Sequence, residues 1–481
     1  MTIRRRQSKN IIRDAGKREF EVEEVVKMKI GETYSLCPYC LRVVIAEKVV
    51  EGDDVYLLKR CPEHGQFKVV IWRGFESYMK KFKFNVGRRR PKPMVRASNG
   101  CPLDCGLCAQ HRQKTCVAVL EVTSKCNLNC PICFASANEF GVFHPSLEDI
   151  WGMYRTLIEN SERPYVVQIS GGEPTVRSDL PEIIAMGKEM GIDYIELNTN
   201  GVVLAKDIEF LRSLKESGLD ALYFSFDGLT PDVYIKRCGV DLLDLKLRVL
   251  ENCKKVGLSV ILVPVIDRHV NYHQVGDIIN FAKRWVPTVV GVHFQPVAYF
   301  GRVNKVPENN DRVTIPDVLK AIEEQTGGEL REENFTPTSC SNIHCDARCY
   351  AIVGTDGRLL PLTYESLGVR GDVEDISRAI RECLCDLWRM PIGGTNPTHA
   401  APGTWEEFVE LAKARYLTIS VMAFQDAWTV EVDRLQECCV HVITPTKKLI
   451  PFCAFNISSI DGRTLYRHKE LGYLKSPPQS Q

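Results

Sequence analysis

Residues 122–138, VTSKCNLNCPICFASAN, set three cysteines in a C-x3-C-x2-C pattern directly after an apolar run. A cubane [4Fe–4S] cluster has four irons, so three thiolates leave one iron without a protein ligand. That open iron can chelate the amino and carboxylate groups of a small molecule. We therefore predict that Cys126, Cys130 and Cys133 hold an iron–sulfur cluster with one position open for a ligand.

Six short β-rich apolar runs begin with this region and alternate with helical patterns. The runs start at residues 117, 165, 193, 221, 258 and 289 and read VAVLEV, YVVQIS, DYIELN, ALYFSF, LSVILVPV and VVGVHFQ. Ser146 and Ser178 precede helical patterns, and Gly191 and Gly218 follow them, as N-caps and C-terminal glycines do. Strands alternating with helices predict right-handed βαβ units and a parallel sheet. Six units favour an α/β fold with a partial (β/α)6 barrel over a complete eight-stranded one.

Polar residues follow these runs at the positions where barrel chemistry is found. Active sites of such barrels lie at the C-terminal ends of the strands. The cysteine loop follows the first run, SGGEPT the second, NTNG the third, SFDG the fourth and a Gln-Pro pair the sixth. We expect Asn200, Asp227 and Gln295 to reach a ligand there. Helix capping or turn formation is the alternative role for these three.

The cysteine motif followed one strand later by GGEP resembles the signature of the radical S-adenosylmethionine (SAM) superfamily. The resemblance implies that the three cysteines bind the SAM cluster and that catalysis begins there. It also implies a cofactor-binding set around SAM: Gly171, Gly172, Glu173, Asn200, Asp227 and Gln295. The glycines would let the backbone approach the methionine end of SAM, and the Glu173 carboxylate would accept from its ammonium group.

The chain has 20 cysteines, and most of the others also fall into groups. CPYC and CPEHG predict a tetrahedral Cys3His site for zinc or a mononuclear rubredoxin-like iron, with these ligands: Cys37, Cys40, Cys61 and His64. A second group suits a fully ligated auxiliary cluster, with structural zinc as the alternative: Cys101, Cys105, Cys108 and Cys116.

Two C-terminal segments, SCSNIHCDARC and ECCVHV with IPFCAFN, supply the remaining candidates. Four ligands for a second auxiliary cluster must come from both segments. We favour Cys340, Cys345, Cys438 and Cys453, and we keep Cys349 and Cys439 as alternatives. Four further cysteines are predicted to be small buried hydrophobes, although the last two are also possible ligands: Cys238, Cys253, Cys383 and Cys385.

Length and composition fit a globular protein of several domains. With 481 residues, 44% hydrophobic and 26% charged, the chain is long enough for two or three domains. We expect a metal-knuckle domain over 1–85, a basic linker and first auxiliary cluster over 86–116, the radical SAM barrel over 117–330 and an auxiliary-cluster domain over 331–481. A net charge of +1 gives no global basic field, so nucleic acid is not an expected partner.

The sequence also bears on the compartment. It has no apolar signal-peptide core and no run near the ~20 apolar residues of a membrane span, so we expect a cytoplasmic protein. In that reducing compartment, grouped cysteines are more often metal ligands than disulfides. The stretch 80–96, KKFKFNVGRRRPKPMVR, has eight Lys or Arg and no acid. It suits peripheral contact with anionic lipid or RNA, or it is simply solvated.

The whole pattern resembles one branch of the superfamily, the archaeal tetraether lipid synthases and their bacterial relatives. The resemblance rests on CPEHG, CPLDCGLC, CNLNCPICFA, GGEPTVRSDLPEI, FDG, FQPVAYFGR and IPFCAFN. It implies coupling of the terminal methyl carbons of isoprenoid chains on archaeol-type lipid substrates. It further implies two auxiliary [4Fe–4S] clusters, a mononuclear iron, peripheral membrane contact and a low-potential electron donor such as ferredoxin.

Other functions fit the same motifs. Members of this branch have also been described as radical SAM methyltransferases acting on a pterin, a methanopterin precursor, and this is our alternative. A peptide maturase would commonly carry a peptide-docking domain, which the sequence does not reveal. A non-catalytic iron–sulfur electron carrier would have no use for an open iron beside GGEP.

Overall fold

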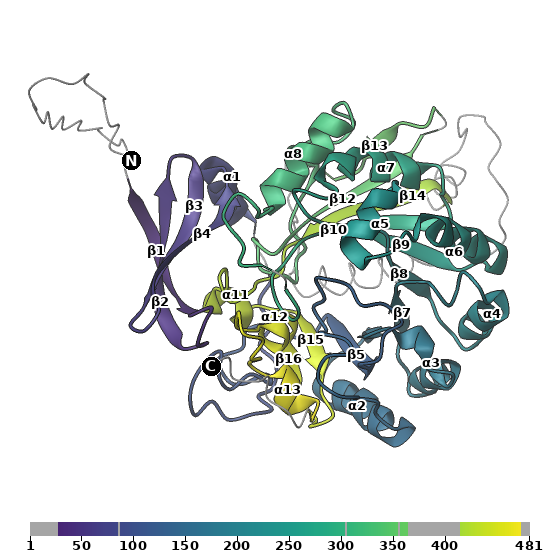
Figure 1. The fold of residues 1–481 in the computed structure, drawn as a ribbon, viewed down its shortest axis with the longest axis horizontal. Coiled ribbons are helices and arrows are strands. Elements are labelled where there is room, and N and C mark those ends of the chain that lie inside the picture. Colours follow the sequence, from purple (N-terminus) through teal and green to yellow (C-terminus); the bar gives the residue numbers. More distant parts are fainter. Residues whose placement is uncertain (1–26, 85–86, 304, 355, 364–413, 473–481) are drawn as a thin grey trace, which may run out of the picture.

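A computed structural model describes residues 27–84, 87–303, 305–354, 356–363 and 414–472 (Figure 1). The predictions for Cys383 and Cys385 lie outside these ranges. Two sheets organise the chain, a small N-terminal sheet and a large curved sheet that carries the predicted barrel.

The N-terminal sheet is an antiparallel meander of four strands. In spatial and chain order they are β1 (Met28–Leu36), β2 (Val43–Glu51), β3 (Asp54–Cys61) and β4 (Gly65–Arg73), followed by helix α1 (Phe75–Lys80). Buried residues alternate along β3, as expected of a sheet with one face packed. Leu57 and Val69 of that face pack in one cluster with Trp428 and Leu435 from the C-terminal segment.

The six predicted parallel strands are all present, which confirms the partial barrel. They are β5 (Val117–Thr123), β6 (Val166–Gly171), β7 (Tyr194–Thr199), β8 (Ala221–Ser225), β9 (Ser259–Val263) and β11 (Val289–Pro296), with the short β10 (Val265–Ile266) beside β11. Each pairs in parallel with the next one along the chain. Every residue of β9 is buried, because helices cover one face of the sheet and the barrel interior lies on the other.

Helices cover the outside of this sheet (Figure 1). They are α2 (Leu147–Asn160), α3 (Leu180–Glu189), α4 (Ile208–Glu216), α5 (Pro231–Cys238), α6 (Leu243–Val256), α7 (Val275–Lys283) and α8 (Ile315–Gln325). Ser146 caps α2 and shares a capping box with Asp149, as its position predicts. The N-cap of α3 is Asp179 and not Ser178, so this helix begins one residue later than expected. Gly191 and Gly218 have positive φ angles after α3 and α4, as predicted.

The C-terminal segment joins the large sheet, and the domain boundary expected at 331 stays a prediction. Its elements are β12 (Asp346–Val353), β13 (Leu359–Pro361), β14 (Tyr416–Met422), α11 (Val432–Gln436), β15 (Val440–Ile443), β16 (Leu449–Pro451), α12 (Phe452–Asn456) and α13 (Arg467–Glu470). Strand β14 lies parallel beside β11 and β15 lies parallel beside β5, so both edges of the six-stranded sheet are extended. The physical reason is that an open edge leaves backbone N–H and C=O groups unpaired.

A buried ion pair fastens the end of the chain to the barrel. Arg467 of α13 donates two hydrogen bonds to Glu121 of β5, at 2.8 and 2.6 Å, and both side chains are 2% exposed. Asn456 accepts from the same guanidinium. Among the residues that the structure describes, no helix is long and apolar enough to cross a membrane.

Candidate active site

A cavity of about 340 Å³ occupies the interior of the barrel. Inward-facing residues of β5 to β11 form its walls, together with residues of β12 and β15. The three cysteines of the opening motif line one part of it, and so do Gly171, Gly172, Glu173, Asn200, Asp227 and Gln295. The structure therefore gathers all nine residues that the sequence assigns to the SAM site around one cavity.

The thiols of the cysteine loop differ in their surroundings. Burial raises the pKa of Cys126 to about 11, whereas a hydrogen bond from the Cys238 thiol lowers the pKa of Cys130. All three cysteines are partly exposed and face the cavity. Three sulfur donors at the mouth of one cavity fit a [4Fe–4S] cluster with an open iron. The ligand role of these three residues stays a prediction.

Two polar side chains that the sequence analysis missed hold this loop. Asn138 accepts from the Cys126 amide and donates to the Cys126 carbonyl, each at 3.0 Å. Arg302 donates to the Cys130 carbonyl at 2.9 Å, and its backbone exchanges two hydrogen bonds with Cys133 at 3.0 and 2.9 Å. The available signal for Arg302 was the FGR that ends FQPVAYFGR.

The two glycines of GGEP are needed for contact between two stretches of backbone. A Cβ on Gly171 would lie 2.2 Å from the Thr123 carbonyl oxygen, and one on Gly172 would lie 2.3 Å from that of Lys125. The Gly172 amide donates to the Thr123 carbonyl at 2.7 Å. The sequence predicted that these glycines let the backbone approach SAM closely. In the structure they let the backbone approach the start of the cysteine loop.

Glu173 is a buried hydrogen-bond acceptor at the same strand ends. Its carboxylate accepts from the Thr175 amide and hydroxyl, the Thr199 hydroxyl at 2.7 Å and the Asn200 amide at 2.7 Å, and the residue is 1% exposed. Four donors already occupy it, so it ties β6 to β7. Its predicted contact with the ammonium group of SAM stays a prediction.

The three later strand-end residues each form a hydrogen bond within the protein, and their contact with SAM or substrate stays a prediction. Asn200 accepts from the Val202 amide at 3.0 Å, the turn contact that was the alternative. Asp227 accepts from the Val265 amide at 2.9 Å. Gln295 donates to the Tyr223 hydroxyl at 2.9 Å. All three nevertheless line the cavity, so turn formation does not remove them from it.

Further polar side chains line the cavity deeper in the barrel. Gln168, Glu196, Tyr223 and His293 project inward from four different strands. Burial lowers the pKa of His293 to about 3, so this imidazole is neutral at ordinary pH. The sequence placed these residues on strands but gave no reason to assign them to the site.

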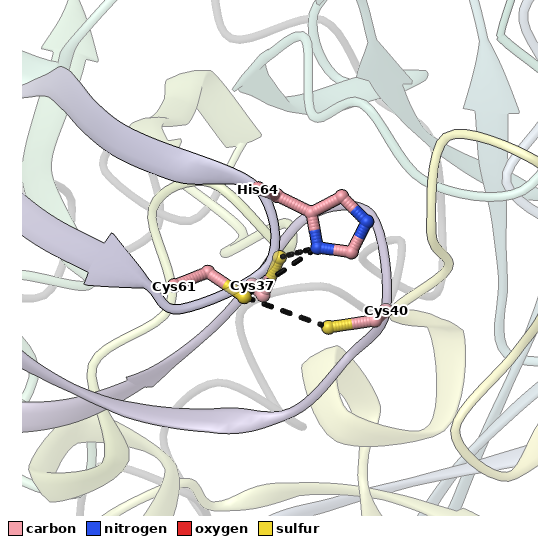
Figure 2. A group of neighbouring side chains, drawn as sticks. All are labelled: Cys37, Cys40, Cys61 and His64. Atoms are coloured by element: carbon pink, nitrogen blue, oxygen red, sulfur yellow. Dashed lines mark hydrogen bonds between the residues drawn. The ribbon is translucent and has the colours of Figure 1, made fainter.

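The predicted Cys3His group is assembled in the N-terminal sheet (Figure 2). The ligand atoms of Cys37, Cys40, Cys61 and His64 all lie within 4.8 Å of one another. The Nδ1 atom of His64 is 3.6 Å from Cys37 Sγ and 3.4 Å from Cys61 Sγ. Although burial opposes ionisation of Cys61, hydrogen bonds including one from His64 lower its pKa to about 6, which favours the thiolate that a metal needs.

A second group of cysteines differs from either predicted set. Cys116, Cys340 and Cys439 have their sulfur atoms within 4.8 Å of one another, and all three line the barrel cavity. The grouping of Cys116 with Cys101, and of Cys340 with Cys453, is therefore corrected. Pairing of β15 with β5 is the cause: the Cys116 amide donates to the Cys439 carbonyl at 2.8 Å, immediately before the two strands begin.

The other predicted ligands form two looser groups. Cys453 is buried, and Cys345 and Cys438 are partly buried. Burial raises the pKa of Cys438 and of Cys453, and repulsion from the Cys345 thiolate raises both further. Arg434 donates to Cys345 Sγ at 3.3 and 3.4 Å. A hydrogen bond with Cys101 and burial raise the pKa of Cys105, and repulsion from Cys101 and Cys108 raises it further. Each of these groups supplies three thiols.

Three cysteines remain to be placed. Cys253 is fully buried in the core, which confirms the prediction for it, and Cys349 on β12 is also buried there. Cys238 is not a core residue, contrary to expectation. It ends α5 and lines the cavity beside Cys130.

The basic linker is partly engaged in contacts. Lys81 is 1% exposed, Arg88 pairs with Glu437 at 2.8 Å, and Arg89 lies 3.7 Å from Glu162. At least these three of its cations are held against the protein. Docking of the linker on a membrane stays a prediction. Fewer of its cations are available for that contact than the sequence suggested.

The chain matches two families of known proteins. Residues 120–282 match the Radical SAM superfamily, and residues 29–73 match the HMPTM N-terminal zinc ribbon domain. A radical SAM barrel implies SAM and a [4Fe–4S] cluster, and the ribbon and the cysteine groups fit additional metal sites. The cofactors expected from the sequence are thereby confirmed.

The similarity to known proteins extends beyond the barrel. A 7,8-dihydro-6-hydroxymethylpterin dimethyltransferase from Methanocaldococcus jannaschii is 39% identical over 472 residues, which cover 88% of this chain and 93% of that protein. A probable GTP 3',8-cyclase from Sulfolobus acidocaldarius is 32% identical over 34% of this chain and 51% of its own length. Among solved structures, Streptococcus suis SuiB superposes with a TM-score of 0.37 at 19% identity, covering 45% of this chain and 47% of SuiB.

The first of these relatives contradicts our main functional prediction, the coupling of archaeol-type lipid chains. It is similar along nearly its whole length and is a pterin methyltransferase by name, so the comparison favours the alternative. Motifs such as CPEHG, CPLDCGLC and GGEP explain the error, because they concern metal centres and strand ends and carry little information about the substrate.

A relative that is 39% identical and matches most of both chains shows the family to which this chain belongs. The radical SAM match covers the cysteine motif and GGEP, and the cavity contains the residues of both. The chain is therefore a radical SAM enzyme and belongs to the same family as the Methanocaldococcus jannaschii protein.

Proposed function

We propose that this protein is a radical SAM methyltransferase that acts on a pterin bearing a hydroxymethyl group. The observation that carries the proposal is the 39% identity to the pterin dimethyltransferase over 88% of this chain. An alignment of that extent cannot be confined to the SAM-binding part at 120–282. It therefore includes segments that line the cavity but do not bind SAM.

The cavity supports a compact, partly polar substrate. Its volume of about 340 Å³ includes the space beside the SAM-binding residues, so a substrate would occupy only part of it. Tyr194 and Tyr223 supply ring surfaces, while Gln168, Glu196 and Gln295 supply hydrogen-bonding groups. A flat bicyclic ring with polar edges matches such a lining.

The chain's own residues would position the substrate and exclude water. When bound, SAM and its cluster supply a carbon-centred radical able to take hydrogen from a C–H bond that no protein base could deprotonate. Leu128, Ile132 and Phe134 of the cysteine loop place apolar side chains around the cavity, which excludes water from the reacting carbon. Glu173 and Asn200 keep the strand ends in place beside that loop.

The direct test is incubation of the reconstituted protein with SAM, a strong reductant and 7,8-dihydro-6-hydroxymethylpterin. Mass spectrometry should detect a pterin that has gained methyl groups, together with 5′-deoxyadenosine and methionine from one SAM and S-adenosylhomocysteine from a second SAM that donates the methyl group, with the reductant supplying the electrons. A variant with Cys126, Cys130 and Cys133 replaced by Ala should form none of these products, because its SAM cluster has lost its ligands. Cys253→Ala, a change in the core away from the cavity, should keep the activity.

The same experiment can overturn the proposal. An unmodified pterin after active SAM cleavage would contradict it. A parallel incubation with archaeol-type phospholipid should leave the lipid unchanged, and joined lipid chains beside an unmodified pterin would reject the methyltransferase assignment.

A further inference from the structure

Glu196 is a carboxylate between apolar residues of the barrel strand β7. It lies on β7 between Ile195 and Leu197, which are fully buried in the core, and its own side chain lines the cavity on the other face. The residue is 3% exposed. Burial of a carboxyl group is costly unless its oxygens are hydrogen-bonded, so a barrel strand would not need this residue for stability.

Only one of its two oxygens has a partner. Oε1 accepts from the Gln168 side-chain amide at 3.1 Å, and Gln168 sits directly opposite on β6. Oε2 is buried and accepts no hydrogen bond. Within the part of the chain that the structure describes, no Lys or Arg forms an ion pair with this carboxylate. A buried acceptor facing a cavity without a partner indicates that a ligand supplies the donor.

The position of Glu196 places such a ligand within the barrel, below the SAM end. Asn200, four residues further along, contacts the cysteine loop through Asn127 at 2.8 Å. At a rise of about 3.3 Å per residue, Glu196 lies roughly 13 Å deeper in the barrel. A ligand held there by one edge would therefore extend toward the cysteine loop.

We propose that Glu196 selects the pterin ring by accepting hydrogen bonds from its N3–H and 2-amino groups. This inference rests on the proposed function. In a 2-amino-4-oxo pteridine these two donors are adjacent and point the same way, and a carboxylate accepts two parallel N–H bonds in this manner. Oε2 has no other partner, and Oε1 retains a lone pair beside the bond from Gln168. Gln168 holds the carboxylate in the orientation that this pairing needs.

The test compares the pterin with its pteridine-2,4-dione analogue, in which an oxygen replaces the 2-amino group. Wild-type protein loaded with iron and SAM should bind the pterin about 10- to 100-fold more tightly, the effect of losing one hydrogen bond to a charged acceptor. In Glu196→Gln the carboxamide accepts from N3–H and donates to the 2-oxo group. The preference should therefore disappear or reverse.

Matched controls isolate the effect of this side chain. Glu189→Gln makes the same chemical change on the exposed face of α3 and should keep the wild-type preference. Iron content and SAM affinity of Glu196→Gln should equal those of the wild type, because the changed atoms do not touch the cysteine loop. Equal binding of the two analogues by wild-type protein would overturn the inference without any variant.

The outcomes also separate this inference from the proposed function. If wild-type protein methylates the pterin and Glu196→Gln keeps the wild-type preference for the 2-amino ring, the role of Glu196 alone is rejected. If wild-type protein binds neither ring, the proposed function is rejected and this inference with it.

Discussion

Individual residues at the strand ends of this barrel mainly hold backbone in place. Glu173 accepts four hydrogen bonds from Thr175, Thr199 and Asn200, and Gly171 approaches the Thr123 carbonyl too closely for any side chain. The GGEP motif is thus explained by contacts within the protein as well as by SAM. Its sequence identifies the superfamily for that reason and says little about the substrate.

The state of ionisation of Glu196 leads to a prediction about pH. Burial raises the pKa of Glu196 to about 8, against a lowering effect of Gln168 and Arg348, while Asp220 raises it further and Tyr223 faces it. The empty site is therefore mainly protonated at neutral pH. Two N–H donors from a ligand favour the ionised form, so binding should release a proton below pH 8.

Calorimetric titration in buffers of different ionisation enthalpy measures that proton. Pterin affinity should rise with pH up to about 8 and level off above it, because the cost of deprotonation then vanishes. Glu196→Gln should release no proton and show no such slope. Binding enthalpies that are identical in both buffers for wild-type protein would refute this account of the carboxylate.

At the residue scale, the sequence could identify candidate ligand side chains but not the face of the sheet toward which each side chain points. Cys126, Cys130 and Cys133 were found because their spacing is a local property of one loop. Glu196 was overlooked because a residue in DYIELN can face either the helices or the barrel interior, and only the register of the sheet decides which.

Among the structural elements, the cysteine loop depends on the segment that follows β11. Gly301 has a φ of +69°, and a Cβ there would lie 2.3 Å from the Cys133 carbonyl oxygen and 2.5 Å from that of Phe134. Gly301→Ala should therefore displace the loop and reduce the iron bound at the SAM cluster. Iron and sulfide analysis, together with the EPR signal of the reduced cluster, provides the measurement.

A second glycine with a similar φ serves as a control, because it distinguishes the steric clash of an added Cβ from the strain of a left-handed backbone. Gly257 has a similar φ of +74° but open space where the Cβ would be. Gly257→Ala should cost only about 1–2 kcal/mol for the left-handed conformation and keep the cluster. Equal iron loss in both variants would show that the contact with Cys133 is unimportant.

Pairing between β15 and β5 gives another prediction at this scale. The pairing brings Cys116 beside Cys439, and Cys340 lies with both, so a Ser substitution at any one of the three should lose the same metal centre. Cys116→Ser combined with Cys439→Ser should lose no more iron than either change alone. Adding Cys453→Ser should remove further iron, because that thiol belongs to another group.

Mössbauer spectroscopy of the purified variants distinguishes the centres. Additive losses from Cys116→Ser and Cys439→Ser would contradict the grouping seen in the structure.

The sequence could not predict this grouping, because Cys116 and Cys439 are brought together by a strand pair whose members are more than 300 residues apart. Proximity along the chain suggested the wrong neighbours.

Over the whole molecule, the C-terminal segment completes the barrel and links it to the N-terminal ribbon. Strands β14 and β15 cover the two edges of the six-stranded sheet, and Lys59 of the ribbon donates to the Ala427 and Trp428 carbonyls at 2.8 and 2.7 Å. Strand periodicity predicted the six central strands correctly. It could not reveal the shared sheet, because such long-range pairing leaves no local pattern.

The central claim is that a pterin bound in the barrel cavity lies within reach of the radical formed at the cysteine loop. The most direct test uses 7,8-dihydro-6-hydroxymethylpterin deuterated at its saturated carbons, with SAM and a strong reductant. The account predicts that deuterium appears in 5′-deoxyadenosine while the pterin gains methyl groups. Methylated pterin accompanied by 5′-deoxyadenosine without deuterium would contradict it.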